Sequence, residues 1–287
     1  MRPVFFLESL LMMSVLLINS SSTAYICSHI QRTKPIITKS SVVACPEQFE
    51  ETLQNNVIAE NLVVVITVNH GMLPFFINFV YFLRRSSISK FIVVTEDARS
   101  HAALEPSYFR HLSRYNTALN DTRSASYKTK AYNTMVSRRP ALIRYVLERG
   151  YNVLYSDVDV VWAKNPLPHL SCGQNYDIAA QLDEGRLCTG FTLFCNSELT
   201  YALTALWEAR MRRSPDLNQK GFNSIAESSG ATCKRLDSLL FQSGREYFDR
   251  GSNRSEAITI HNNWIIGSDK KMRRFKDHGL WFANASL

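Results

Sequence analysis

Continuous apolar runs divide the chain, and such runs are typical of strands buried on both faces of a parallel sheet. The first run, "NLVVVITVNHG", covers residues 61–71, and the second, "KFIVVTED", covers residues 90–97. Between them, residues 73–85 carry apolar positions at helical spacing and end in two arginines. The order strand, helix, strand predicts a right-handed βαβ unit at the start of the folded part.

The pattern then alternates between helix and strand. Residues 126–149 have helical spacing, with Pro140 suited to a first helical turn and Gly150 suited to a C-terminal cap. Further along we expect three strands, at residues 152–162, 176–183 and 188–194, and a helix at residues 197–213. Together these elements predict one main α/β domain with a mostly parallel sheet flanked by helices.

The N-terminal part has a different pattern. Residues 4–18 are mostly apolar and are followed by a Ser/Thr run. This segment is short for a membrane span of about 20 residues and fits the core of a signal peptide, while a retained signal anchor or a buried helix remains open. We expect residues 1–24 to be a signal peptide or signal anchor, residues 25–56 to be a stem without a clear period, and residues 57–287 to be the folded domain.

Composition narrows the class of protein without naming its ligand. The 287 residues are 45% hydrophobic and 20% charged, which is ordinary for a folded protein and excludes a disordered chain. The net charge of +8 suits nucleic acid, a membrane surface or an anionic small substrate, and the basic residues are spread along the chain. The six cysteines fit no zinc module and leave any disulfide pairing open. Glycosylation acceptor patterns occur at Asn120, Asn253 and Asn284.

Two carboxylates interrupt the apolar stretch "VLYSDVDVVWAKNPL" at residues 153–167, and this placement is costly unless a cation meets them. Asp157 and Asp159 are two residues apart, so in one strand their side chains would leave the same face. Carboxylate oxygens suit Mg²⁺ or Mn²⁺, and ligands bind at the carboxyl ends of strands in such sheets. The stretch therefore predicts a metal site. The alternative is that both carboxylates cap the next loop or pair with Arg139 or Arg144.

A second candidate segment, "HNNWIIGSDKKMRRFKDHGLW", covers residues 261–281. His261 could be a third metal ligand as a neutral imidazole, and Lys270 and Lys271 could bind a diphosphate. A lone histidine is more often structural. Combined with the carboxylate pair, however, the segment indicates one site for a metal and a phosphate.

These stretches, together with "CTGF", closely resemble the nucleotide-diphospho-sugar transferase domain of the plant rhamnogalacturonan-II alpha-1,3-xylosyltransferases and their animal relatives, over about residues 60–282. The resemblance implies a GT-A fold and retaining transfer from a UDP-sugar, with UDP-xylose suggested, to a glycan or glycoconjugate acceptor. It further implies dependence on Mn²⁺ or Mg²⁺ in a type II Golgi membrane protein with a lumenal catalytic domain. No nucleic acid partner is expected, and the membrane would be met only through the N-terminal segment.

The resemblance also assigns roles to individual residues. Asp157 would face the ribose and the metal, while Asp159 and His261 would bind the metal. Lys270, or Lys271 if the register shifts by one, would hold the leaving diphosphate. The residues expected around the uridine are Thr67, Asn69 and Arg139, and those expected against the donor sugar are Asp183, Thr189 and Gly190.

One position departs from the pattern of the family. In "LNQKGFN", Gln219 matches, but Asn218 stands where the family has an aspartate. Asparagine keeps the size and the hydrogen bonding of aspartate but loses its charge and any role as base or nucleophile. The resemblance makes Asn218, Gln219 and Asp183 the candidate catalytic residues, and the missing charge at Asn218 puts the activity in question. Either the aspartate is dispensable, or the protein is a catalytically impaired lumenal protein that binds a UDP-sugar or a carbohydrate.

A third class of protein also has the D-x-D-x-V pattern that begins here at Asp157. In haloacid dehalogenase-type phosphatases the first aspartate is a nucleophile near the start of the domain, and a later Gly-Asp pair supports Mg²⁺. Here the motif lies roughly a hundred residues into the folded part. The candidate pair, around Gly267 and Asp269, has the wrong spacing. The sequence therefore favours a transferase.

Overall fold

The structure, a computed structural model, describes residues 46–104, 111–113, 130–173, 175–214 and 218–283. The expected targeting segment, most of the expected stem, and the glycosylation patterns at Asn120 and Asn284 lie outside these residues. Within them, no helix combines the length and the apolar character needed to cross a bilayer.

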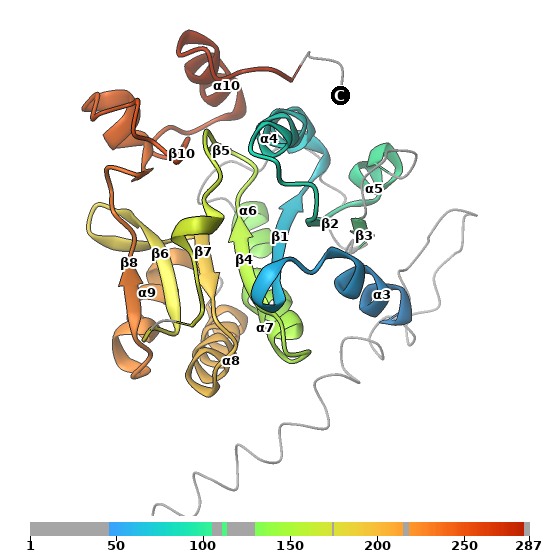
Figure 1. Ribbon diagram of the computed structural model, residues 1–287. Helices are drawn as coiled ribbons and strands as arrows, with labels where there is room; N and C mark the ends of the chain where they lie inside the picture. The colour runs from blue at the N-terminus through green and yellow to red at the C-terminus, as the bar shows by residue number, and fades with distance from the viewer. Residues whose placement is uncertain (1–45, 105–110, 114–129, 174, 215–217, 284–287) are drawn as a thin grey trace, which may run out of the picture. The chain divides into compact units, whose positions relative to one another are not determined.

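A seven-stranded sheet organises the domain, with the strand order β3-β2-β1-β4-β7-β6-β8 (Figure 1). Strand β7 is antiparallel to both of its neighbours, and the remaining pairs are parallel, so the prediction of a mostly parallel sheet is confirmed. The strands are β1 (Leu62–Val68), β2 (Ile92–Thr95), β3 (His111–Ser113), β4 (Asn152–Ser156), β6 (Ile178–Asp183), β7 (Arg186–Phe194) and β8 (Cys233–Arg235).

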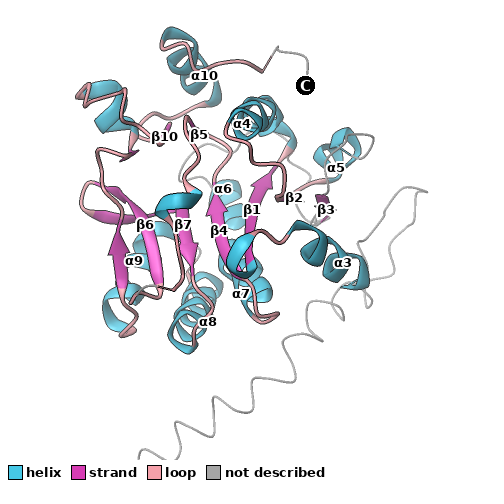
Figure 2. Cartoon of the chain, in the orientation of Figure 1, coloured by secondary structure: helices cyan, strands magenta, loops and turns pink. Residues whose placement is uncertain are grey.

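Helices cover both faces of this sheet (Figure 2). Helix α4 (Leu73–Arg85) joins the parallel strands β1 and β2, which confirms the βαβ unit. The helix expected over residues 126–149 is divided into α6 (Lys130–Val136) and α7 (Arg139–Leu147), with Pro140 in the first turn of α7 as predicted. The other helices are α3 (Pro46–Asn56), α5 (Ala98–Leu104), α8 (Glu198–Arg213), α9 (Asn218–Ser228) and α10 (Ser268–Asp277), with a π-helical turn at Arg245–Asp249 and short 3₁₀ turns.

Two hydrophobic cores lie on opposite faces of the sheet, because successive side chains of a strand point to opposite faces. In β1, Val64 and Ile66 belong to the core formed with α4 and α10, and Val63 and Val65 belong to the core formed with α3, α7, α8 and α9. All four side chains are fully buried or nearly so. The continuous apolar run in the sequence thus reflects burial on both faces.

The folded domain begins earlier than expected. Residues 46–56 were predicted to end a stem, but they form α3, which buries Phe49 and Leu53 in the second core. The Phe49 ring stacks on Tyr145 of α7 with centroids 4.9 Å apart. Two apolar residues in an otherwise polar segment gave little periodic signal, and tertiary packing rather than local pattern specifies this helix.

The strand expected at residues 152–162 is interrupted, so the prediction of one continuous strand is wrong. Strand β4 ends at Ser156, and β5 (Val160–Trp162) belongs to a second sheet of order β5-β10-β9. Its partners are β9 (Phe241–Gln242) and β10 (Thr259–His261). Asp157 and Asp159 therefore lie in a turn between two sheets and do not share the face of one strand.

A disulfide joins Cys172 to Cys195, with the two Cα atoms 5.3 Å apart. It links the loop that follows β5 to the residue after β7. Of the other cysteines that the structure describes, Cys188 and Cys233 are free thiols.

Candidate active site

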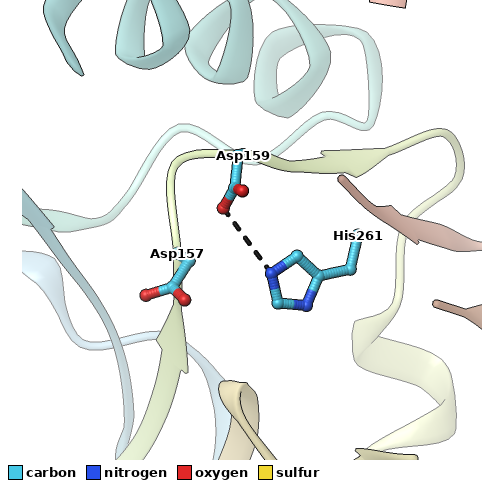
Figure 3. A group of neighbouring side chains, drawn as sticks. All are labelled: Asp157, Asp159 and His261. Carbon is cyan, nitrogen blue, oxygen red and sulfur yellow. Dashed lines mark ion pairs between the residues drawn. The ribbon is translucent and has the colours of Figure 1, made fainter. Parts of the chain in front are cut away.

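Three side chains from different parts of the fold meet at the turn after β4. The backbone N–H of Asp157 donates to the carbonyl of Gly190 in β7 (2.7 Å), which ties this residue to the main sheet. The carbonyl of Asp159 accepts from the N–H of Asn262 (2.9 Å), which ties it to the second sheet, where His261 ends β10. One ligand atom from each of Asp157, Asp159 and His261 lies within 4.8 Å of the others (Figure 3).

Asp159 is buried between two cationic groups. Its Oδ1 lies 3.6 Å from Nε2 of His261, and its Oδ2 accepts a hydrogen bond from the ammonium of Lys271. Burial alone raises the pKa of Asp159, but the charges of Lys271 and His261 outweigh it and hold the pKa well below its usual range. The carboxylate is therefore ionised and available to a cation.

Asp157 is held by Arg139, as the alternative interpretation of the sequence expected. Nη2 of Arg139 lies 2.7 Å from Oδ1 of Asp157, and Nη1 donates to the backbone carbonyl of Thr189 (2.9 Å) and to its hydroxyl (3.1 Å). The guanidinium also lies over the Tyr155 ring, 4.3 Å from its centroid. Burial lowers the pKa of Arg139, but Asp157 and Tyr155 raise it to well above its ordinary value. By contrast, Arg144 pairs with Glu208.

Because Gly190 has no side chain, a space remains between Asp157 and His261. A Cβ atom at this position would lie 2.5 Å from Oδ2 of Asp157 and 2.5 Å from Cε1 of His261, closer than real atoms approach. Two carboxylates and an imidazole that converge on such a space form a mixed set of oxygen and nitrogen donors of the kind that binds divalent metals. The residues present therefore fit a divalent cation.

The tautomer of His261 is fixed by a buried glutamine. Oε1 of Gln181 lies 3.1 Å from Nδ1 of His261, and the amide nitrogen of Gln181 donates to the carbonyl of Gln242 (2.8 Å). When the ring gives up its Nε2 proton and keeps the one on Nδ1, the lone pair of Nε2 faces the cluster. Burial lowers the pKa of His261, but Cys188, 3.4 Å from Nδ1, and Asp159 raise it above its ordinary value. A divalent cation competes with that proton for Nε2.

Of the two candidate lysines, the fold brings Lys271 to the cluster and leaves Lys270 exposed. The register is set by Asn262, which is fully buried. Its side chain donates to the carbonyl of Lys271 (2.9 Å) and accepts from Nε of Arg274 (2.8 Å), so α10 is fixed to the end of β10.

The candidate catalytic residues separate into two places. Gln219 donates to Oδ2 of Asp183 (2.8 Å), and the indole N–H of Trp264 donates to Oδ1 of the same carboxylate. Asn218 instead donates from Nδ2 to the carbonyl of Val136 (2.8 Å), at the end of α6. Asn218 thus makes no hydrogen bond to another predicted site residue among the described residues.

Of the three residues expected at the uridine, Thr67 and Asn69 also differ in their contacts. The hydroxyls of Thr67 and Tyr155 lie 2.8 Å apart, and because the Tyr155 ring stacks on Arg139, Thr67 is connected to the cluster. Asn69 accepts from the N–H of Met72 (3.1 Å) and caps the 3₁₀ turn His70–Met72.

Sequence reasoning missed three residues of this region: Gln181, Tyr155 and Trp264. Gln181 carried a usable signal, because it is a polar residue in the apolar run "IAAQL", as the two aspartates are in theirs. Tyr155 and Trp264 lie inside the stretches that carried the candidate motifs, but nothing in their spacing indicated a role.

Residues 86–275 match the family model of nucleotide-diphospho-sugar transferases. The chain belongs to this family. The chain is 26% identical over 261 residues to UDP-D-xylose:L-fucose alpha-1,3-D-xylosyltransferase 3 of Arabidopsis thaliana. The aligned part covers 79% of this chain and 68% of that protein. It is also 27% identical over 201 residues to UDP-galactose:fucoside alpha-3-galactosyltransferase of Dictyostelium discoideum. There the aligned part covers 59% of this chain and 31% of that protein.

The fold agrees with this assignment. The transferase is similar to the structure of WbbM, a bifunctional glycosyltransferase, with a TM-score of 0.50 and 12% identity, over 76% of this chain and 50% of that one. The architecture is that of GT-A glycosyltransferases, as the sequence led us to expect. Family membership also decides against the phosphatase interpretation.

Proposed function

We propose that this protein is a retaining, metal-dependent glycosyltransferase that moves a sugar from a UDP-sugar to a fucoside acceptor. The observation that carries the proposal is the convergence of Asp157, Asp159 and His261 within 4.8 Å, with the ammonium of Lys271 on the same carboxylate. Such a site binds a diphosphate through a cation and a lysine together.

Each residue of the cluster has a role in this proposal. Asp157, Asp159 and His261 hold Mn²⁺ or Mg²⁺, which when bound stabilises the negative charge that develops on the departing diphosphate. Lys271 neutralises Asp159, and once a cation shares that carboxylate its ammonium is available to the diphosphate. Arg139 fixes the orientation of Asp157, because the position of its guanidinium is itself set by Thr189.

The remaining assignments follow from the contacts of the cluster. Thr67 and Asn69, at the end of β1, are proposed to bind the uridine. Thr189 and Gly190 line the space beside Asp157 and are proposed to face the donor sugar. Asp183, held by Gln219, is proposed to lie beside the reacting sugars (2.8 Å between Oδ2 and Nε2).

The names of two relatives support the choice of acceptor and stereochemistry. One uses UDP-D-xylose and the other UDP-galactose, but both are named for a fucose or fucoside acceptor and an alpha-3 linkage. Both donors carry their sugar in the α configuration, so an α product retains it. A retaining enzyme delivers the acceptor hydroxyl to the face that the diphosphate leaves and needs no strongly positioned inverting base.

The alternative, an impaired protein that binds a UDP-sugar without turnover, rested on Asn218. Its amide donates a buried hydrogen bond to the Val136 carbonyl (2.8 Å), which a carboxylate cannot do. The asparagine therefore has a structural reason of its own. Asn218 is therefore compatible with an active enzyme and does not by itself support an impaired one.

We further propose that the catalytic domain is lumenal, in the Golgi. The Cys172–Cys195 disulfide supports this, because such bonds persist in oxidising compartments. The expected N-terminal signal anchor or signal peptide is consistent with the same pathway.

The decisive experiment measures UDP release by the full-length protein with a panel of UDP-sugars, Mn²⁺ and methyl α-L-fucopyranoside. We expect one donor to be consumed, with an α-linked product by NMR. Asp159→Asn should abolish the reaction, while Asp269→Asn, at an exposed carboxylate in α10, should not. Metal-dependent binding of UDP-sugars without turnover of any donor would favour the alternative.

A further inference from the structure

An exposed tryptophan projects from the loop that follows the metal cluster. Trp264 lies three residues after His261, and 44% of its surface is accessible, which is unusual for the largest apolar side chain. Its φ of 61° places it in the left-handed region, which is unfavourable for a bulky residue such as tryptophan. Such strain persists where the surrounding structure enforces it and where function uses it.

The preceding residue enforces this conformation. Asn263 accepts through Oδ1 from the N–H of Gly244 (2.6 Å), and its backbone carbonyl accepts from Arg274. A Cβ atom on Gly244 would lie 2.2 Å from that carbonyl, so only glycine permits the close approach. The backbone that presents Trp264 is therefore fixed on two sides.

The ring itself is also fixed. Its N–H donates to Asp183, and the guanidinium of Arg245 lies over one face, 3.9 Å from the ring centroid, while pairing with Glu184. Arg245 lies over one face, and with this contact in place 44% of the surface of the residue remains accessible. The result is a rigid aromatic surface open to solvent.

This surface lies next to the proposed reaction centre. Three residues of chain span at most about 10 Å, which limits the separation between Trp264 and His261. Asp183, which holds the indole, is two residues from Gln181, which holds His261. A sugar on Trp264 is therefore within reach of a donor sugar at the cluster.

We propose that Trp264 is the acceptor platform and that it stacks on the apolar face of a 6-deoxyhexose such as fucose. This inference rests on the proposed function. In a 6-deoxyhexose a methyl group replaces the hydroxymethyl group, and the C–H groups of the ring provide an apolar surface that matches the face of an indole. The indole is held without using its open face, so binding requires little ordering of the side chain.

Binding can be tested apart from turnover, because the four tryptophans differ in exposure. Trp162 and Trp207 are fully buried. Among the tryptophans that the structure describes, only Trp264 is classed as exposed. Titration of methyl α-L-fucopyranoside into the full-length protein with UDP and Mn²⁺ should change the tryptophan emission of the wild type and of Ile266→Ala. The change should be absent in Trp264→Phe. Ile266 is the matched control, since it is 58% exposed in the same loop.

Kinetics provide the second test. In Trp264→Ala the KM for the fucoside should rise about ten-fold, as expected for the loss of an aromatic contact, while the KM for the UDP-sugar changes much less, because Trp264 reaches the donor side only through its hydrogen bond to Asp183. A rise in the donor KM alone would place the nucleotide on Trp264 and overturn the proposal. It is also overturned if neither the emission nor the acceptor KM depends on Trp264.

The two proposals fail in different ways. If the wild type turns over no UDP-sugar but the fucoside still changes the emission of Trp264, the proposed function fails and the platform stands. If the wild type transfers a sugar and Trp264→Ala behaves like Ile266→Ala, the platform fails and the proposed function stands.

Discussion

Gln181 fixes the ring of His261 through a contact of 3.1 Å between Oε1 and Nδ1, and both side chains are buried. The orientation of the glutamine is set in turn by its hydrogen bond to the carbonyl of Gln242 (2.8 Å). The histidine can therefore offer only Nε2 to a metal, because Nδ1 is engaged.

Replacing Gln181 should weaken metal binding more than it weakens the fold. Gln181→Leu removes the acceptor for Nδ1, and loss of such a partner typically costs about 10- to 100-fold in metal affinity. Gln242→Leu is the matched control, since its side chain is equally buried and donates to two backbone carbonyls away from His261. Calorimetric titration with Mn²⁺ measures both. Equal affinity in the two variants would contradict the role of Gln181.

Gly190→Ala should disrupt the cluster directly. The added methyl group would stand 2.5 Å from both Asp157 and His261, so the two side chains must separate or the strand must shift. We expect loss of measurable Mn²⁺ binding and of UDP release. Gly173→Ala is the control, because there the nearest atom is 3.8 Å away. Retained Mn²⁺ affinity in Gly190→Ala would show that the cation binds elsewhere.

The two adjacent lysines should behave very differently. Lys271→Met removes the ammonium that meets Asp159 and should lower kcat/KM for the UDP-sugar by about 10²- to 10³-fold, a typical effect for a group that stabilises developing charge. Lys270→Met alters an exposed side chain and should stay close to the wild type. Steady-state kinetics with varied UDP-sugar make the comparison. A larger loss in Lys270→Met would mean that the register of α10 in the complex differs.

Restoring the family's aspartate should not improve the enzyme. Asn218→Asp would place a carboxylate against the Val136 carbonyl in a buried position and should destabilise the protein by about 1–3 kcal/mol. Urea unfolding measures the stability, and UDP release measures the activity. If the variant instead transfers sugar faster at unchanged stability, Asn218 is a catalytic defect and the impaired-protein alternative gains support.

Much of the fold could be predicted from the sequence because its signals are local. The runs around Val64 and Val93 are continuous and β-branched, and such a run is typical of a strand buried on both faces. Helix α3 could not be predicted in this way, since Phe49 and Leu53 owe their burial to partners distant in sequence. The break at Asp157 was also hidden, because the strands on either side of it are both apolar.

The candidate site was predictable in its residues but not in its geometry. Asp157, Asp159 and His261 stood out by residue type, and the structure brings them together even though the strand expected to align the two aspartates is interrupted. The choice between Lys270 and Lys271 depends on the buried contacts of Asn262 with α10, and no spacing rule contains that information.

The break between β4 and β5 has a thermodynamic consequence. Asp157 is anchored to the large sheet, and Asp159 and His261 are anchored to the small one. A cation bound by all three would cross-link the two sheets, so its binding energy would also oppose their separation. At 100 times its dissociation constant, such an ion adds about 2.7 kcal/mol to folding. Mn²⁺ should therefore slow amide exchange in β10, and the last quarter of the chain would depend on metal supply for part of its stability.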